Sequence, residues 1–168
     1  MADDQCYKVS LMKAATFWPR ALIILGALGL GIAMSAKEPF FEGLGSYSRK
    51  VTTTSAEAQR YFKQGLAFLH GFNHGAAIAS FQEAARLDPK CAMAHWGTAL
   101  ACGPHINLTV MPPPAVEMAW NELKLAQQNA EHGSPVERDL IEALSHRYAN
   151  PPPQDRALLD QAYGGGLA

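Results

Sequence analysis

Residues 56–89 combine a helical spacing of apolar side chains with glycine and alanine at positions that would face inward. Apolar residues recur every three or four positions on both sides of a break at residues 71–75, where glycine and asparagine gather. That period is typical of amphipathic helices, and the break is typical of a turn. Thr54 or Ser55 is expected to cap the first helix, and Pro89 ends the second because the residue before a proline avoids the helical conformation. The pattern predicts a helix–turn–helix of about 34 residues.

Small side chains would let these two helices approach closely. Gly65 lies on the first helix and Ala77 and Ala84 lie on the second, so that Phe81 can fill the groove between them. This arrangement resembles a tetratricopeptide repeat, which places an aromatic, a glycine and an aromatic on its first helix and alanine, an aromatic, alanine and proline along its second. The resemblance implies a solenoid of helical hairpins that binds proteins or peptides and catalyses no reaction. The residues that match the repeat, and that we expect to pack inside it, are Tyr61, Gly65, Phe68, Ala77, Phe81, Ala84 and Pro89.

Two further hairpins are predicted downstream, each less regular than the first. A helix that begins at residue 92 is followed by a long connection at residues 103–114 and by a second helix over about residues 113–131. Ser134 then opens a third unit with the signature of a capping box and a proline at the first helical position. Three prolines end that helix, and a last helix is expected over about residues 154–163.

These elements predict an all-α fold, a short solenoid of about three helical hairpins across residues 56–163 with a tail at residues 164–168. A solenoid usually needs at least about three repeats and a polar terminal cap. The chain is therefore interpreted as the N-terminal part of a longer protein, as an altered reading frame, or as a module that completes itself by self-association. The inward faces of the third unit and the last helix are expected to carry Val136, Leu140, Ile141, Leu144, Tyr148, Ala157, Leu158 and Ala162.

Residues 1–36 are expected to hold a signal peptide or a membrane anchor. Residues 21–36 are uncharged and apolar and follow three lysine and arginine side chains, which is the order of regions in a secretory signal. With the apolar residues before it, this stretch approaches about 20 residues, enough to span a bilayer, and both interpretations stay open. In either case the repeat domain would lie outside the cytoplasm, in the periplasm or anchored to the inner membrane. Residues 37–55 are rich in glycine, serine and threonine and are expected to form a linker.

Charge and motif content argue against several classes of function. The formal net charge is −1 and lysine and arginine do not cluster, so nucleic acid is not an expected partner. The sequence has no nucleophile elbow, no phosphate-binding glycine loop and no paired carboxylates in a suitable context. We therefore expect neither a catalytic residue nor a cofactor. Cys91 and Cys102 are expected on one helix about 16 Å apart, which is too far for a disulfide bond.

Polar residues on the first helix of each hairpin are the candidate contacts for a protein or peptide partner. The resemblance implies this, because those helices line the concave surface of a tetratricopeptide solenoid. The irregular connection at residues 103–114 is a second candidate, since such loops often lie on one binding face; its apolar residues could equally pack over the end of the hairpin. The partner-binding candidates are Gln64, Asn73, His95, His105 and Asn107.

An alternative from a different class is a metal- or haem-associated exported protein that uses His74, His95 and His105. Three histidines are a ligand set of catalytic zinc, but sequence separation does not establish that these three converge. The run from Cys91 to His95 lacks the second thiol of the covalent haem motif CxxCH. The preferred interpretation therefore contains no metal.

Overall fold

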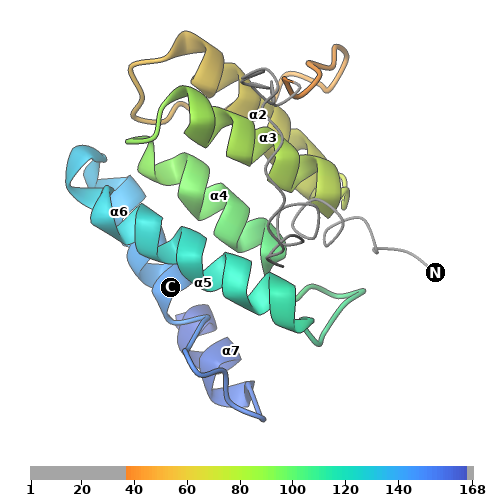
Figure 1. Cartoon of the computed structure of the whole chain (residues 1–168), viewed down its shortest axis with the longest axis vertical. Coiled ribbons are helices and arrows are strands. Elements are labelled where there is room, and N and C mark those ends of the chain that lie inside the picture. The colour runs from red at the N-terminus through yellow and green to blue at the C-terminus, as the bar shows by residue number, and fades with distance from the viewer. Residues whose placement is uncertain (1–36, 166–168) are drawn as a thin grey trace, which may run out of the picture.

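The computed structural model describes residues 37–165, and the regular elements in that range are all helices (Figure 1). The predicted all-α class is thus confirmed for these residues. The predicted signal or anchor at residues 1–36 lies outside the described range, and no helix within 37–165 has both the length and the apolarity needed to cross a bilayer. The elements are α2 Ala56–His70, α3 His74–Leu87, α4 Ala92–Cys102, α5 Pro113–Gln128, the 3-10 helix η1 Ala130–His132, α6 Pro135–Ser145 and α7 Ala157–Gly165.

Side chains just outside three of the helices fix where those helices begin. Ser55 accepts a hydrogen bond at 3.1 Å from an amide in the first turn of α2, and Asn73 caps α3 in the same way. Ser134 and Glu137 form the predicted capping box at the start of α6. Each contact satisfies an amide that has no partner inside its own helix. The local sequence therefore determines where these helices start.

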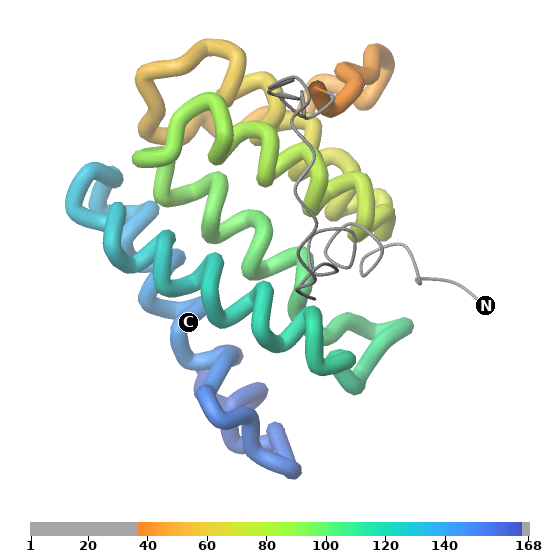
Figure 2. Tube along the Cα trace, viewed as in Figure 1, coloured from red at the N-terminus to blue at the C-terminus, as the bar shows by residue number. Residues whose placement is uncertain are grey.

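The first four helices form two hairpins that lie side by side (Figure 2). Helix α2 packs on α3, α3 on α4, and α4 on α5. Helix α6 packs against α4 and α5, whereas the main neighbour of α7 is α6. The Trp96 indole of α4 donates a hydrogen bond to the Leu140 carbonyl of α6 at 3.0 Å. The Tyr148 hydroxyl, which follows α6, donates to the Ala99 carbonyl of α4 at 2.6 Å, so two hydrogen bonds join the third unit to α4.

Phe81 joins three helices at the centre of the stack. Its side chain is fully buried, and a Cβ atom placed on either Gly65 or Gly97 would come within 2.6 Å of its ring. Carbon atoms do not approach so closely, so both glycines are needed for α2 and α4 to lie against the Phe81 ring. Gly65 was expected in such a position from the sequence. The sequence did not single out Gly97 for such a position.

Four residues of the predicted inward faces are exposed instead, namely Val136, Ala157, Leu158 and Ala162. Val136 is 55% exposed and Leu158 is 79% exposed, and the prediction that all four face the core was wrong. The buried stripe of α6 runs through Glu137, Ile141 and Leu144, and Val136 lies about 100° around the helix from Glu137. Leu158 is exposed because α7 has α6 as its main neighbour and contains no buried residue.

Candidate functional site

An extended stretch of the chain lies along α2, where a linker was expected. Residues 37–55 contain no helix, but they contact α2 first on one side and then, after turning back, on another (Figure 1). Val51 is only 5% exposed and belongs to the hydrophobic core. The segment is therefore packed as part of the helical domain.

Gln64 holds the first part of this segment by its main chain. Gln64 is 2% exposed, and its Nε2 donates to the carbonyl of Pro39 at 3.0 Å while its Oε1 accepts from the amide of Phe41 at 2.8 Å. Nε2 also donates to the hydroxyl of Ser80 on α3 at 3.1 Å, which fixes the orientation of the amide group. One glutamine thus satisfies the carbonyl of one residue and the amide of the second residue after it, which point to the same side of an extended chain.

Gln59 makes the same pair of contacts with the returning part of the segment. Its Oε1 accepts from the amide of Val51 at 2.9 Å, and its Nε2 donates to the carbonyl of Arg49 at 3.0 Å. Positions 59 and 64 are five residues apart, which places them about 140° apart around the helix. Helix α2 therefore binds two stretches of main chain without regular secondary structure, on two different sides and with the same side-chain chemistry.

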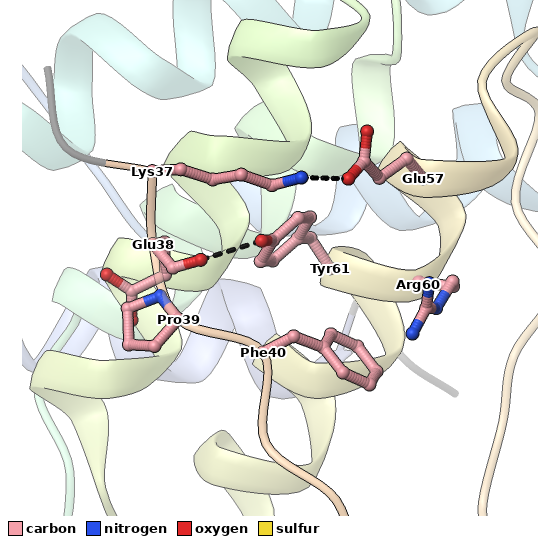
Figure 3. Close-up of a pocket in the computed structure, with 7 residues that line it drawn as sticks. All are labelled: Lys37, Glu38, Pro39, Phe40, Glu57, Arg60 and Tyr61. Carbon is pink, nitrogen blue, oxygen red and sulfur yellow. Dashed lines mark hydrogen bonds and ion pairs between the residues drawn. The ribbon is translucent and has the colours of Figure 1, made fainter. Parts of the chain in front are cut away.

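Aromatic and charged side chains of α2 lie along the first part of this segment (Figure 3). The Tyr61 hydroxyl donates to the carbonyl of Glu38 at 2.6 Å, and the Tyr61 ring meets the edge of Phe40 with 6.0 Å between centroids. The Arg60 guanidinium lies 4.1 Å from the centre of the Phe40 ring, a cation–π contact. Phe41 packs edge to face on Phe68 with 5.5 Å between centroids. Main-chain contacts thus position the segment, and two phenylalanines that are 43% and 44% exposed add ring contacts.

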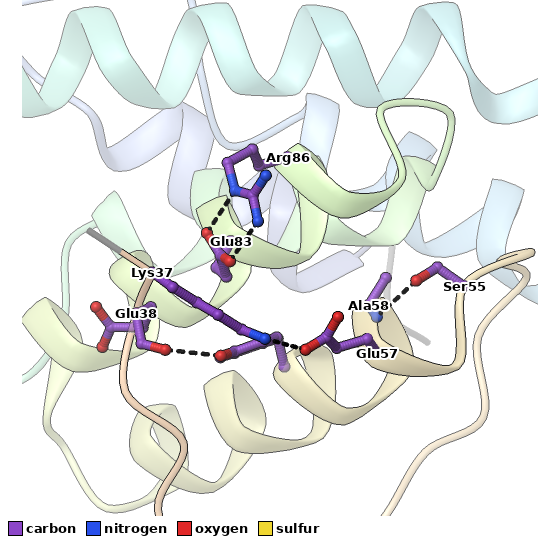
Figure 4. Close-up of polar contacts among 8 residues, drawn as sticks. Lys37, Glu38, Ser55, Glu57, Ala58, Glu83 and Arg86 are labelled. Carbon is purple, nitrogen blue, oxygen red and sulfur yellow. Dashed lines mark hydrogen bonds and ion pairs between the residues drawn. The ribbon is translucent and has the colours of Figure 1, made fainter. Parts of the chain in front are cut away.

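Two ion pairs lie beside the start of the same segment (Figure 4). Lys37 pairs with Glu57, and this hydrogen bond raises the pKa of Lys37 and lowers that of Glu57. On α3, the guanidinium of Arg86 binds both carboxylate oxygens of Glu83 at 2.7 and 2.8 Å. Partial burial raises the pKa of Glu38, and the negative charge of Glu83 raises it further. A cavity of about 320 Å³ beside the first of these ion pairs is lined by Lys37, Glu38, Pro39, Phe40, Glu57, Arg60 and Tyr61.

Glu137 ties the end of the segment to α6. Its two carboxylate oxygens accept from the amide and the hydroxyl of Thr52 at 2.7 and 2.6 Å, and from the amide of Ser134 at 2.6 Å. Burial alone would raise the pKa of Glu137, but these hydrogen bonds outweigh it and hold the pKa below its usual value. Asp88 accepts in the same way from Thr53 and Thr54. Residues 49–55 therefore link α2, α3 and α6.

The other predicted partner contacts lie away from this segment. Asn73 caps α3, and Asn107 is exposed in the loop after α4, where its amide donates to His105 Nδ1 at 3.3 Å. His95 is 8% exposed and bridges α4 and α5. Its Nδ1 lies 2.7 Å from a carboxylate oxygen of Glu122, and its Nε2 lies 3.2 Å from the carbonyl of Pro89. Both partners only accept, so both nitrogens donate when the ring is protonated.

The three histidines of the metal alternative do not come together. His74 and His105 stack with 3.9 Å between ring centroids and 10° between ring planes. His95 is held apart from them, because its two nitrogens face Glu122 and Pro89. Among residues 37–165, no group of three or more histidine, cysteine, aspartate or glutamate side chains is arranged to hold a metal ion.

The two cysteines are buried at opposite ends of α4. Cys91 precedes the helix as its N-cap and Cys102 is its last residue, so the helix keeps the two sulfur atoms beyond bridging distance of each other. Burial raises the pKa of the Cys91 thiol to about 11. A thiol in that state is protonated at neutral pH and is a poor nucleophile.

Sequence reasoning identified Gln64 as a contact residue but missed Gln59 and the segment that both bind. One signal was available: Phe40 and Phe41 are adjacent aromatics in a stretch otherwise rich in glycine, serine and charge. A scan against models of protein families gave no match, and neither did searches of curated proteins and of solved structures. A functional assignment therefore depends on the residues of the site itself.

Proposed function

We propose that this chain is a helical-repeat scaffold that binds extended peptide segments of a protein partner and catalyses no reaction. The observation that carries the proposal is the pair of glutamines on α2. Gln59 and Gln64 each bind a carbonyl and an amide two residues apart in a non-helical stretch of the chain itself. In this interpretation residues 37–42 occupy the site as an internal ligand.

The chemistry of the site suits a peptide better than a small molecule. Hydrogen bonds to the main chain contribute affinity for any extended sequence, about 0.5–1.5 kcal/mol each. Selectivity would come from the aromatic contacts, because an edge-to-face pair adds about 0.5–1.5 kcal/mol beyond the buried area. Tyr61, Phe68 and Arg60 make these contacts with Phe40 and Phe41. The expected ligand therefore carries two adjacent aromatic residues in an extended conformation.

The proposal assigns the scaffold to the tetratricopeptide type. Its support is the first hairpin, in which Phe81 packs against Gly65 and the second helix ends just before Pro89. The hydrophobic segment at residues 21–36 further suggests export, so the partner would be a protein of the periplasm or of the outer face of the inner membrane.

A competition experiment on the full chain tests peptide binding. A fluorescent peptide with the sequence of residues 37–46 is titrated onto the wild-type protein and onto Phe40→Ala/Phe41→Ala, with anisotropy as the readout. The tethered segment competes at an effective concentration in the millimolar range, so we expect at least about tenfold tighter binding to the variant, in which the internal competitor is weakened.

Two controls define the specificity of that binding. A peptide with both phenylalanines replaced by alanine is expected to bind neither protein. Adding Gln64→Leu to the double variant is expected to abolish binding, because leucine has no amide to bond the main chain of the peptide. Its volume is similar to that of glutamine, so the packing is retained. The proposal fails if a variant that melts cooperatively shows no binding at millimolar peptide.

A further inference from the structure

A second cavity lies between α5 and the connection from α6 to α7. Its volume is about 530 Å³, and it is remote from the α2 site because it involves the other end of the helical stack (Figure 1). One face of α5 supplies most of it, and the end of the long loop before α5 closes one side. The lining residues are Met111, Pro113, Val116, Glu117, Trp120, Asn121, Ala149, Asn150 and Pro152.

The cavity exists because no helix covers this face of α5. In the first two hairpins, α3 is covered by α4. Here the three prolines at residues 151–153 lead the chain on to α7, whose main neighbour is α6 and which buries none of its residues. The apolar side chains of Val116 and Trp120 are left half-buried beside the gap.

Three polar side chains lie around this apolar floor without a partner of their own. Glu117, Asn121 and Asn150 are exposed, and their side chains make no hydrogen bond or ion pair within residues 37–165. Glu117 is the only charged residue among those that line the cavity. A ligand that fills the site would therefore place an apolar stem on the floor and a cation beside the carboxylate.

The indole of Trp120 adds a preference for a cation with a flat face. The ammonium of Lys124 lies 4.6 Å from the centre of this ring, so the indole already takes part in a cation–π contact, and an arriving guanidinium would compete with Lys124 for it. A guanidinium can stack on an indole and bind a carboxylate through two parallel hydrogen bonds, whereas an ammonium is a strongly hydrated point charge. Its three methylene groups match an apolar floor next to a charged rim.

We propose that this cavity binds an arginine side chain of an extended peptide, with Glu117 as the partner of the guanidinium. Asn121 and Asn150 would bind the peptide main chain on either side, as Gln59 and Gln64 do on α2. The inference rests on the proposed function in one respect, namely that the ligand is a peptide. It gives the scaffold a second and separate specificity: two adjacent aromatics at α2 and a basic residue at α5.

The test uses the full-length protein and a blocked peptide, Gly-Gly-Arg-Gly-Gly, followed by NMR at the Trp120 indole and the side-chain amides of Asn121 and Asn150. The matched probe contains citrulline, which has the shape of arginine without its charge. We expect saturable shifts with the arginine peptide and at least about tenfold weaker binding of the citrulline peptide. Equal affinity for the two peptides, or no shift at these three groups at millimolar peptide, would overturn the proposal.

Two substitutions separate a charge contact at the cavity from a general effect of charge. Glu117→Gln is expected to weaken binding of the arginine peptide about tenfold. Position 117 is exposed, so glutamate and glutamine are both compatible with the fold there. Glu131→Gln removes a carboxylate from η1, where the side chain is 79% exposed, and is expected to leave binding unchanged. Equal effects of the two substitutions would contradict a specific site.

The arginine peptide contains no aromatic residue, so this experiment is independent of the α2 site. Binding of the residue 37–46 peptide together with no binding of the arginine peptide would overturn only the present inference. Binding of the arginine peptide together with no binding at α2 would instead overturn the proposed occupancy of the α2 site and leave the cavity as the peptide site.

Discussion

The first hairpin and the last helix both have helical sequences, but they differ in how many neighbouring elements bury their side chains. Both regions were predicted as helices with apolar stripes. In the first hairpin, Tyr61, Phe62 and Phe81 are at most 2% exposed, because α2 is covered by α3, by α4 and by residues 37–55. Helix α7 buries no residue and has α6 as its main neighbour. Apolar spacing thus predicts the helix, whereas burial depends on how many sides are covered.

The largest difference between the two regions is expected for truncation of their large apolar side chains. Phe81→Ala should lower the free energy of unfolding by about 3–5 kcal/mol, because it leaves a cavity where three helices meet. Leu158→Ala should change it by less than about 0.5 kcal/mol, because that side chain is 79% exposed. Urea titrations of the full-length proteins followed by circular dichroism measure both values. Similar losses in the two variants would show that α7 is as well packed as the first hairpin.

A smaller effect is expected from adding a methyl group, which overfills the core where Phe81→Ala leaves a cavity. Gly65→Ala places a Cβ atom 2.6 Å from ring atoms of Phe81, and such overpacking costs about 1–3 kcal/mol. Gly164→Ala in α7 meets nothing within 4 Å and should stabilise that helix by at most about 1 kcal/mol. Thermal melts of the two variants should therefore shift in opposite directions, and a stabilising Gly65→Ala would contradict the close approach of α2 to Phe81.

Next in size is the contact of Glu137, which attaches residues 49–55 to α6. Glu137→Gln should lower the free energy of unfolding at pH 7 by about 1–2 kcal/mol, because charge-assisted hydrogen bonds to Thr52 and Ser134 are lost. The pKa of this carboxyl is lowered in the folded protein. Its contribution is therefore present above the unfolded value of about 4.3 and is lost as the pH falls through the folded pKa.

Urea titrations between pH 7 and pH 3 measure that contribution. The difference between wild type and Glu137→Gln should narrow as the pH falls below about 4. Glu142→Gln is the matched control on the same helix, since its side chain is 72% exposed, and it should change stability by less than about 0.5 kcal/mol at every pH. A difference that stays constant down to pH 3 would argue that Glu137 acts by shape alone.

The parts of the fold that could be predicted from the sequence depend on local signals. The capping box of Ser134 and Glu137 involves residues three positions apart, and Pro89 limits α3 by its own backbone chemistry. The meeting of Gly65 and Phe81 occurs within one hairpin, so a repeat pattern contains both. The position of Gly97 beside the same ring depends on how the next hairpin stacks, and the sequence of that hairpin does not specify its register.

Most of the site could not be predicted from the sequence, because its contacts join segments that are far apart along the chain. The bond from Gln64 to Pro39 spans 25 residues and that from Thr52 to Glu137 spans 85. Gln64 was identified as a polar residue on a first helix, but nothing local indicated that the partner would be the chain itself. The stretch expected to be a linker contains two adjacent aromatics, Phe40 and Phe41, and such residues rarely remain unpacked at a flexible position.

The smallest expected effect comes from a buried ion pair between a histidine and a glutamate in the central stack, compared with an exposed pair of the same kind on α6. Burial alone would lower the pKa of His95, but the bond to Glu122 outweighs it and raises the pKa above the usual 6.5. Its stabilisation is therefore complete below pH 6.5 and is lost as the pH rises through the folded pKa. The free energy of unfolding of the wild type should fall by about 1 kcal/mol over that range, and that of His95→Gln should fall by less.

His146 and Glu142 provide the comparison, since their side chains are 46% and 72% exposed and lie 3.7 Å apart. Solvent screening makes such a pair worth at most about 0.5 kcal/mol, so His146→Gln should retain the pH dependence of wild type. Urea titrations at pH 6 and pH 9 measure both variants. If His146→Gln removed the pH dependence of stability and His95→Gln preserved it, the ion pair between α4 and α5 would not contribute to stability. Burial in the central stack would then not make an ion pair stronger than an exposed one.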